Sequence, residues 1–305
     1  MKYRAVATAI VLLMLSGVSL AADSAKGGEI KRPPIVGVAW IGLRTADLDA
    51  TRKFYSGDLG LEEIAGIQNS ENGLTRSVFQ INSRQFVQVL PELTDPKQNR
   101  LIEIAFETTN AERLRAYLAS KGVEVPEKIE PMAEGTRGFA ISDADNHVVK
   151  FVQFMEKPSA KGAQPDGRVS THMIHAGFIV HHRAEEDRLF KDVLGFTETW
   201  HGGMTDDKVS WIDMRVPDGK DWLEYMMDYE DSDVRISGIM NHLALGVASV
   251  KDSYDEVVKR GMDPEKPKIG RDGKWQLNLY TPDQTRVELM EPKPVQTLCC
   301  SPMRQ

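Results

Sequence analysis

Four ionisable residues interrupt strand-like apolar runs in the second half of the chain. His175 lies in "MIHAGFIV" and His242 in "NHLALGVAS", while Glu224 lies in "WLEYM" and Glu288 in "RVELM". One histidine in such a run is usually a packed core residue, and one glutamate usually lies on an exposed strand edge. Four unpartnered polar groups in a protein interior would be costly, so they need a common partner.

The spacing of these residues repeats. Glu224 follows His175 by 49 residues, and Glu288 follows His242 by 46. Imidazole and carboxylate groups together suit zinc, nickel, cobalt, iron(II) or manganese, and the lack of a thiolate argues against copper(I). The set therefore predicts a site for one divalent metal ion.

The first half of the chain has the same spacing but different chemistry. Trp40 and Gln88 are 48 residues apart, and Glu103 and Lys150 are 47 apart. A lysine ammonium and an indole offer no usable lone pair to a metal. We expect Glu103 and Lys150 to form an ion pair and this half to serve as scaffold.

The elements that position these residues follow one pattern four times. A strand-like run precedes an amphipathic helical pattern, which ends at a glycine 19 or 20 residues beyond Trp40, Glu103, His175 and His242. The four glycines are Gly60, Gly122, Gly195 and Gly261. Short strand-like runs separated by turn residues come next. The sequence predicts an α+β protein of four βαβββ modules, because each unit reads as one strand, one helix and about three strands.

The unit boundaries divide the chain into two lobes. Residues 156–168, "EKPSAKGAQPDGR", are rich in Pro, Gly, Lys and Ser and read as a linker. The first two-module lobe is expected at 33–155, the second at 169–292, and a tail at 293–305. The tail holds both cysteines, Cys299 and Cys300, which are too few for a disulfide framework. Free thiols or pairing with another chain are as plausible as a bond between neighbours.

The N-terminus has the pattern of an export signal. Lys2 and Arg4 precede an apolar run that ends in small residues at Ala21 and Ala22. These features predict a signal peptide over 1–22 and a periplasmic or secreted protein, with an uncleaved anchor as the alternative. The net charge of −7 and the absence of a basic run argue against a nucleic-acid partner. We expect a small-molecule substrate, no membrane association after cleavage, and a monomer or homodimer.

Several segments carry a family resemblance. "FYSGDLGLEE", "LFKDVLGFTE" and "TPDQTRVELMEP", in the four-unit arrangement, resemble the vicinal oxygen chelate superfamily, which includes glyoxalase, bleomycin resistance protein and extradiol dioxygenase. The resemblance implies that the modules of each lobe pair into an open cupped barrel with the metal inside. It places the ligand positions on His175, Glu224, His242 and Glu288, a set similar to that of glyoxalase I.

The resemblance implies a metal-dependent enzyme with glyoxalase-like lyase or isomerase chemistry, and the N-terminus predicts that it is exported. Its metal would act as a Lewis acid on a metal-bound enediolate of a small oxygenated substrate. Glu288 is the favoured base because the family's reactive glutamate lies on the last strand, and Glu224 is nearly as good by symmetry.

Two alternatives stay open. An extradiol ring-cleaving dioxygenase would use Fe(II) and typically omits the position of Glu224. Its signature requires a tyrosine where Asn278 stands, a histidine near 269–271 and Gly or Pro at Gln284, and none is present. A non-catalytic binding or resistance protein would retain its ligand without turnover.

Other polar residues give weaker signals. His201 could line the cup as a donor beside the site, although its Gly-rich surroundings favour a turn. Arg271, Lys274 and Trp275 could hold an anionic or aromatic substrate, although their segment favours a solvated hairpin turn. His181 and His182 point to opposite sides of an extended chain and read as surface residues.

Overall fold

The computed structural model describes residues 30–68, 75–132, 134–156, 167–227, 229 and 234–304. From Lys31 onwards the chain forms one compact unit. The predicted signal peptide and most of the predicted linker lie outside the described residues. Within the described part, no helix is long and apolar enough to cross a lipid bilayer.

The first two modules follow each other along the chain. Module one comprises β1 (Ile35–Arg44), α1 (Leu48–Arg52), η1 (Lys53–Asp58, a π-helical continuation of α1), β2 (Glu62–Gln68), β3 (Thr75–Gln80) and β4 (Phe86–Leu90). Module two comprises β5 (Leu101–Thr108), α2 (Ala111–Ser120), β6 (Glu130–Pro131), β7 (Thr136–Ser142) and β8 (Val148–Phe154).

The last two modules repeat this order, with one added helix between them. Module three comprises β9 (Met173–Val180), α3 (Arg183–Asp187), η2 (Arg188–Val193, also π-helical), β10 (Thr197–Gly202), β11 (Trp211–Arg215) and β12 (Trp222–Met227). Helix α4 (Val234–Ile239) precedes module four, which comprises β13 (His242–Gly246), α5 (Val250–Lys259), β14 (Lys268–Ile269), β15 (Trp275–Tyr280) and β16 (Arg286–Met290).

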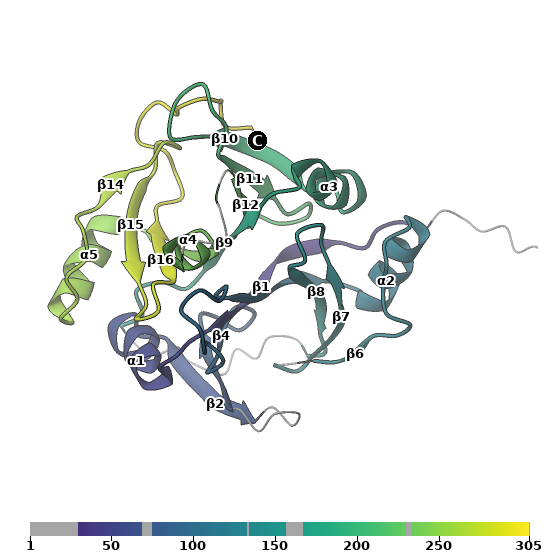
Figure 1. The fold of residues 1–305 in the computed structure, drawn as a ribbon, viewed down its shortest axis with the longest axis horizontal. Coiled ribbons are helices and arrows are strands. Elements are labelled where there is room, and N and C mark those ends of the chain that lie inside the picture. The colour runs from purple at the N-terminus through teal and green to yellow at the C-terminus, as the bar shows by residue number, and fades with distance from the viewer. Residues whose placement is uncertain are drawn as a thin grey trace, which may run out of the picture. The chain divides into compact units, whose positions relative to one another are not determined.

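The modules pair to give two eight-stranded sheets of identical topology. Their strand orders are β2-β3-β4-β1-β5-β8-β7-β6 and β10-β11-β12-β9-β13-β16-β15-β14 (Figure 1). Within a module the first and last strands are parallel, whereas the two first strands at the centre of each sheet are antiparallel. The predicted fold class, α+β with four βαβββ modules paired into two lobes, is confirmed.

Local sequence explains where the longer helices begin and end. The Asn110 side chain accepts from the Arg113 amide at the start of α2, and the Ser249 hydroxyl accepts from the Asp252 amide at the start of α5. The glycines that were predicted to end the helices all have positive φ, including Gly122 at 81° and Gly261 at 94°. That left-handed conformation is readily adopted by glycine.

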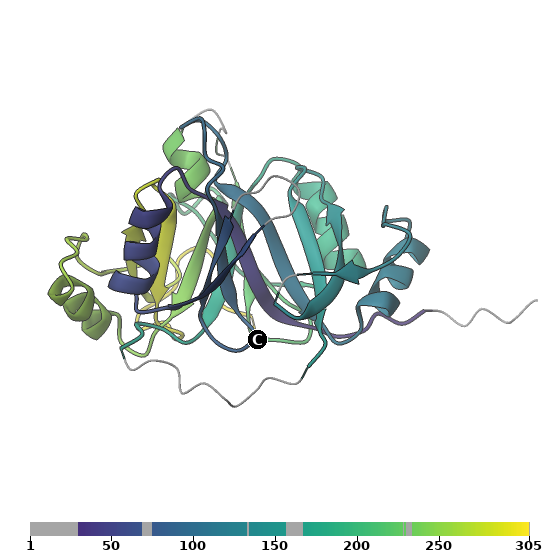
Figure 2. The same ribbon diagram turned by 90° about the horizontal axis from the view of Figure 1, so that it is seen from below.

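One hydrophobic core runs through both lobes. Successive strand residues point to opposite faces of a sheet, so each sheet has a core face and a concave face. Phe190 of η2 contacts Phe106 on β5 of the first sheet and Phe178 on β9 of the second. Helix α1 lies beside module four in both views (Figures 1 and 2), where the Thr45 hydroxyl donates to Asp283.

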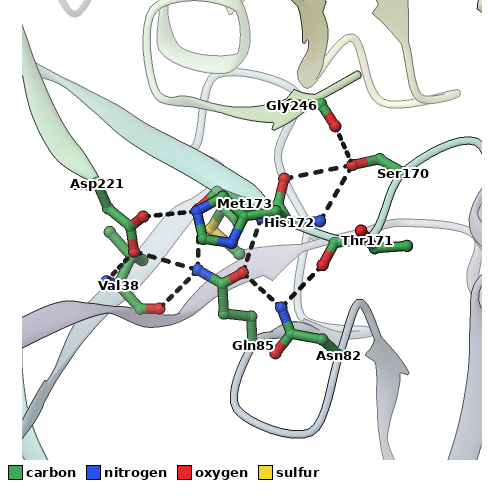
Figure 3. Close-up of polar contacts among 9 residues, drawn as sticks. All are labelled: Val38, Asn82, Gln85, Ser170, Thr171, His172, Met173, Asp221 and Gly246. Atoms are coloured by element: carbon green, nitrogen blue, oxygen red, sulfur yellow. Dashed lines mark hydrogen bonds and ion pairs between the residues drawn. The ribbon is translucent and has the colours of Figure 1, made fainter. Parts of the chain in front are cut away.

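A buried polar network also joins the lobes (Figure 3). The Gln85 amide nitrogen of lobe one donates to the Val38 and Met173 carbonyls, and the Met173 amide donates back to the Gln85 oxygen at 2.8 Å. Asp221 of lobe two accepts from the Val38 amide at 2.9 Å and lies 2.7 Å from His172 Nε2. These contacts fix the start of β9, the strand that carries His175.

Candidate metal centre

The four predicted ligands converge on the concave face of the second sheet. His175 Nε2 lies 3.1 Å from His242 Nε2, 3.6 Å from Glu224 and 3.5 Å from Glu288. Glu224 also lies 3.1 Å from His242 Nε2. The donor atoms of His175, Glu224 and His242 all lie within 4.8 Å of one another. Strands β9, β12, β13 and β16 contribute one residue each.

The orientation of His242 is set by its neighbours. Its Nδ1 donates to the Met240 carbonyl at 2.9 Å, which leaves the Nε2 lone pair facing the other donors. The Asn241 side chain accepts from the Ile179 amide at 3.0 Å and so fixes the entry of β13 against β9. Gly177, opposite His242 in the sheet, leaves room for the ring, because a Cβ there would lie 2.1 Å from His242 Cε1.

Both histidines are buried and have lowered pKa values. Burial is the main cause for each ring, and the Arg286 guanidinium further lowers the pKa of His242. Nearby Glu224 partly opposes the shift for His175. Both rings are therefore neutral near pH 7, which is the form of histidine that binds a metal.

Glu288 and the neighbouring Asp213 are held in an environment that disfavours their charged forms. Burial raises the pKa of Glu288 to about 7, with Arg286 opposing the shift and Glu224 adding to it. Asp213 lies opposite Glu224 on the neighbouring strand, and burial raises its pKa well above the usual range. A bound divalent cation would reverse this effect on Glu288 by favouring its carboxylate form.

A cavity of about 440 Å³ opens onto the donor atoms. Its walls combine aromatic and methionine side chains with a few polar groups, the composition usual for a small-molecule site. The lining includes Trp200, Met204, Trp211, Trp222, Met226, Tyr229, Met240, Asn278, Tyr280, Arg286 and Met290 as well as His175, Glu224 and Glu288.

The residues present fit a divalent metal ion. Four buried polar atoms around the cavity lack a protein partner: His175 Nδ1, Trp222 Nε1, Asn278 Oδ1 and Arg286 Nε. Buried polar atoms are rarely left unpaired. The presence of four of them at one cavity therefore indicates that the cavity binds a ligand. The Nε2 atoms of the two histidines lie 3.1 Å apart. If both neutral rings carry their proton on Nδ1, both Nε2 lone pairs can bind one ion.

Lobe one has closed the equivalent position with its own side chains. Glu103 accepts from Trp40 Nε1 at 2.7 Å and pairs with Lys150 at 2.5 Å, so the predicted ion pair is confirmed. A separate apolar cluster packs around Trp40 on this face, with Ala39, Val78, Phe86, Ala105 and Val152 as its other buried members.

The weaker candidates lie apart from the four ligands. His201 does not line the cavity, and its Nδ1 lies 2.8 Å from Glu198. Arg271 lines the rim and donates to Cys299 Sγ, which forms a disulfide with Cys300. Of the three states that the sequence left open for these cysteines, the structure shows the disulfide between neighbours. Lys274 is buried rather than solvated and pairs with Asp272 at 3.0 Å.

Sequence reasoning missed several residues that shape the site. Arg286, Gly177 and Trp222 each lie two positions from a predicted ligand on the same strand. Because side chains alternate along a strand, that spacing places them on the concave face with the ligand. The spacing alone could have identified them, whereas the approach of Asp213 and Asn278 from adjacent strands required the sheet register.

Comparisons with known proteins agree with this architecture. Residues 37–151 match the model of the Glyoxalase/Bleomycin resistance protein/Dioxygenase superfamily. No curated protein matches the sequence. Among solved structures, an Mn(II)-bound glyoxalase from Novosphingobium aromaticivorans is 19% identical, with a TM-score of 0.64 over 89% of this chain and 86% of that one.

Two dioxygenases share the fold to a similar extent. A catechol 2,3-dioxygenase is 16% identical with a TM-score of 0.65, covering 87% of this chain and 92% of that one. The 2,3-dioxygenase LapB from Pseudomonas sp. KL28 is 15% identical with a TM-score of 0.67, covering 88% and 97%. Residues 37–151 thus match the model of this superfamily, and most of the chain shares its fold with these solved structures.

Proposed function

We propose that the protein is an exported, metal-dependent enzyme that moves a proton at a carbon next to two neighbouring oxygens of a small substrate. This is glyoxalase-like isomerase or lyase chemistry. The observation that carries the proposal is the convergence of both glutamates on one histidine nitrogen, at 3.6 Å for Glu224 and 3.5 Å for Glu288. This arrangement provides a fourth donor, Glu224, which a set of two histidines and one glutamate would lack.

His175, Glu224, His242 and Glu288 would hold the metal. When bound, the ion would supply Lewis acidity to the substrate oxygens. The chain's own contribution is a proton acceptor beside them. Glu288 is buried and faces the cavity, and the His175 ring 3.5 Å from it is neutral, so its carboxylate can take and return a proton.

The remaining cavity groups would position the substrate. Trp211, Trp222 and Tyr229 offer apolar faces at the wall, and the unpartnered Trp222 Nε1 and Asn278 Oδ1 offer one donor and one acceptor. Such fixed groups orient a substrate without reorganising during the reaction.

The proposal of export rests on the N-terminal sequence alone. Two cations, an apolar run and small residues at Ala21 and Ala22 fit a cleaved signal peptide. Expression with the full N-terminus should give mature protein in the periplasm or medium, starting at residue 22 or 23 by N-terminal sequencing. Retention of Met1 in a cytoplasmic product would contradict export.

Metal analysis tests the site directly. Purified protein should contain one divalent ion per chain, and His242→Ala should lose it, whereas Glu103→Gln in lobe one should retain it. Absence of metal from wild-type protein supplied with zinc, nickel, cobalt, iron(II) and manganese would end the proposal.

Proton exchange tests the chemistry without knowledge of the natural substrate. Metal-loaded protein in D₂O should exchange the carbon-bound protons of hydroxy ketones or 2-hydroxy acids, as detected by NMR, and Glu288→Gln should lower the rate at least a hundredfold. Full exchange activity in a metal-loaded Glu288→Gln variant would remove Glu288 as the base. Iron(II) with oxygen uptake on a catechol, and no proton exchange, would favour the dioxygenase alternative instead.

A further inference from the structure

Arg286 breaks a pattern shared by the other modules. Each module has a residue two positions before its site position on the last strand. In modules one to three these residues are Phe86, Val148 and Trp222, and in module four the residue is Arg286. A charged side chain therefore stands on the concave face where the equivalent positions are apolar.

The guanidinium lies over the imidazole of His242. Arg286 Nη2 is 3.0 Å from Nδ1 and 2.8 Å from Nε2 of that ring. A donor aligned with the in-plane lone pair of one nitrogen would lie far from the other nitrogen. The nearly equal distances thus place Nη2 above the ring face, and the Nε2 lone pair stays free for a metal.

Apart from the contact of Nη2 with the His242 ring, Arg286 has no acceptor in the described part of the chain. The His242 Nδ1 proton goes to Met240 and the Nε2 lone pair faces the other predicted ligands, so the ring engages only Nη2, through its face. Its Nε is buried and unpartnered, and it forms no ion pair with a described residue. Unpaired guanidinium donors beside a cavity need an acceptor from a ligand.

The other cations at the cavity are already partnered or exposed. Arg271 pairs with Asp206 at the rim, and Lys268 is exposed. The half-buried Arg286 guanidinium is thus the charge best placed to select a bound molecule. It lies beside the predicted metal ligands, where one end of a chelating substrate would sit.

We propose that Arg286 is a specificity residue that binds an anionic oxygen of the substrate, so that the site takes small organic acids with a hydroxyl or carbonyl next to a carboxylate. The aromatic walls at Trp211 and Tyr229 favour acids with an aromatic or apolar group at the other end. This inference deepens the proposed function and rests on it for the placement of the metal.

A matched pair of probes isolates the charge. Mandelate and its amide, mandelamide, have the same shape and the same neighbouring oxygens, but the amide is neutral and presents N–H donors to the arginine. Binding is followed by quenching of tryptophan fluorescence, because Trp200, Trp211 and Trp222 line the cavity. The measurement is made on metal-loaded protein, and metal content is determined for every variant.

Wild-type protein should bind mandelate at least tenfold more tightly than mandelamide, as expected for one charge-assisted contact. Arg286→Met should remove this preference while leaving mandelamide affinity within about twofold, and Arg286→Lys should keep part of it. Arg271→Met is the matched control, since this second cavity arginine is ion-paired, and it should keep the full preference.

Three results would overturn the assignment: no preference in wild-type protein, an unchanged preference in folded Arg286→Met, or no saturable binding of mandelate at millimolar concentration. Failure of the proposed function has a different signature. If metal-loaded wild-type protein shows no proton exchange but prefers mandelate through Arg286, the anion site stands and the catalytic proposal falls.

Discussion

The two lobes share one sheet topology but treat their concave faces in opposite ways. In lobe one, Trp40, Glu103 and Lys150 satisfy one another by direct hydrogen bonds and an ion pair. In lobe two, His175 and Trp222 keep buried polar atoms without protein partners, facing a cavity. The same register of strands thus makes either a closed scaffold or an open site, and a few side chains decide which.

Substitutions of the glycines opposite the two sites should have the largest effects, and they distinguish metal binding by lobe two from the structural role of lobe one. A Cβ at Gly177 would lie 2.1 Å from His242 Cε1, and a Cβ at its lobe-one equivalent Gly42 would lie 2.7 Å from Glu103 Cγ. Gly177→Ala should therefore displace His242 and weaken metal affinity at least tenfold, as measured by chelator competition. Gly42→Ala should lower the melting temperature and leave metal affinity unchanged. Wild-type affinity in Gly177→Ala would show that the ring position is not critical.

Removing the cation of lobe one should affect stability alone. Among the described residues, Lys150→Met leaves the buried Glu103 with only the Trp40 hydrogen bond, and the free energy of unfolding should fall by about 2 kcal/mol. Urea unfolding of metal-free protein measures the loss, and Lys150→Arg should recover most of it. A fall in metal content in Lys150→Met, rather than in stability, would mean that the lobes are not functionally distinct.

The contact between the lobes should make stability depend on pH. Glu186 of lobe two is fully buried and accepts from the Ala144 and Asp145 amides of lobe one. Burial is the main cause that raises its pKa to about 8, with Asp143 adding to the shift. An acid with a raised pKa stabilises the fold fully below its unfolded value of 4.5, and this contribution is lost as the pH rises through about 8.

Glu186→Gln should remove that loss. The variant should gain about 1–2 kcal/mol over wild-type protein at alkaline pH and little near pH 5, as measured by urea unfolding at both. Glu185→Gln, at an exposed position of the same helix, is the control and should show no such difference. Equal stability of wild-type and Glu186→Gln protein at alkaline pH would contradict the raised pKa.

Much of this arrangement could be predicted from the sequence because it depends on local period and spacing. The strand-helix-glycine pattern recurs four times, so the modules and the equivalence of His175, Glu224, His242 and Glu288 follow from the order of the residues alone. The Glu103–Lys150 pair follows from the same register, since an acid and a base stand at equivalent positions of the first and last strands of one module.

Other features depend on contacts that spacing does not encode. Asp213 approaches Glu224 from an adjacent strand, and Lys274 is buried although its segment reads as an exposed turn. The disulfide between Cys299 and Cys300 lies beside Arg271 because the tail returns across the second sheet, where the Cys299 amide donates to the Arg271 carbonyl. The direction of a returning tail is set by tertiary packing rather than by its own sequence.

The antiparallel contact between β9 and β13 has a consequence for assembly. It is the seam of the second sheet, and each side of it supplies one histidine and one glutamate to the predicted site. Neither module alone holds a complete set of donors, so an ion would bind only after the two modules have docked. By mass action, metal concentration would then control the assembly of lobe two. If the protein is exported as proposed, folding of this lobe would be completed in the compartment that provides the ion.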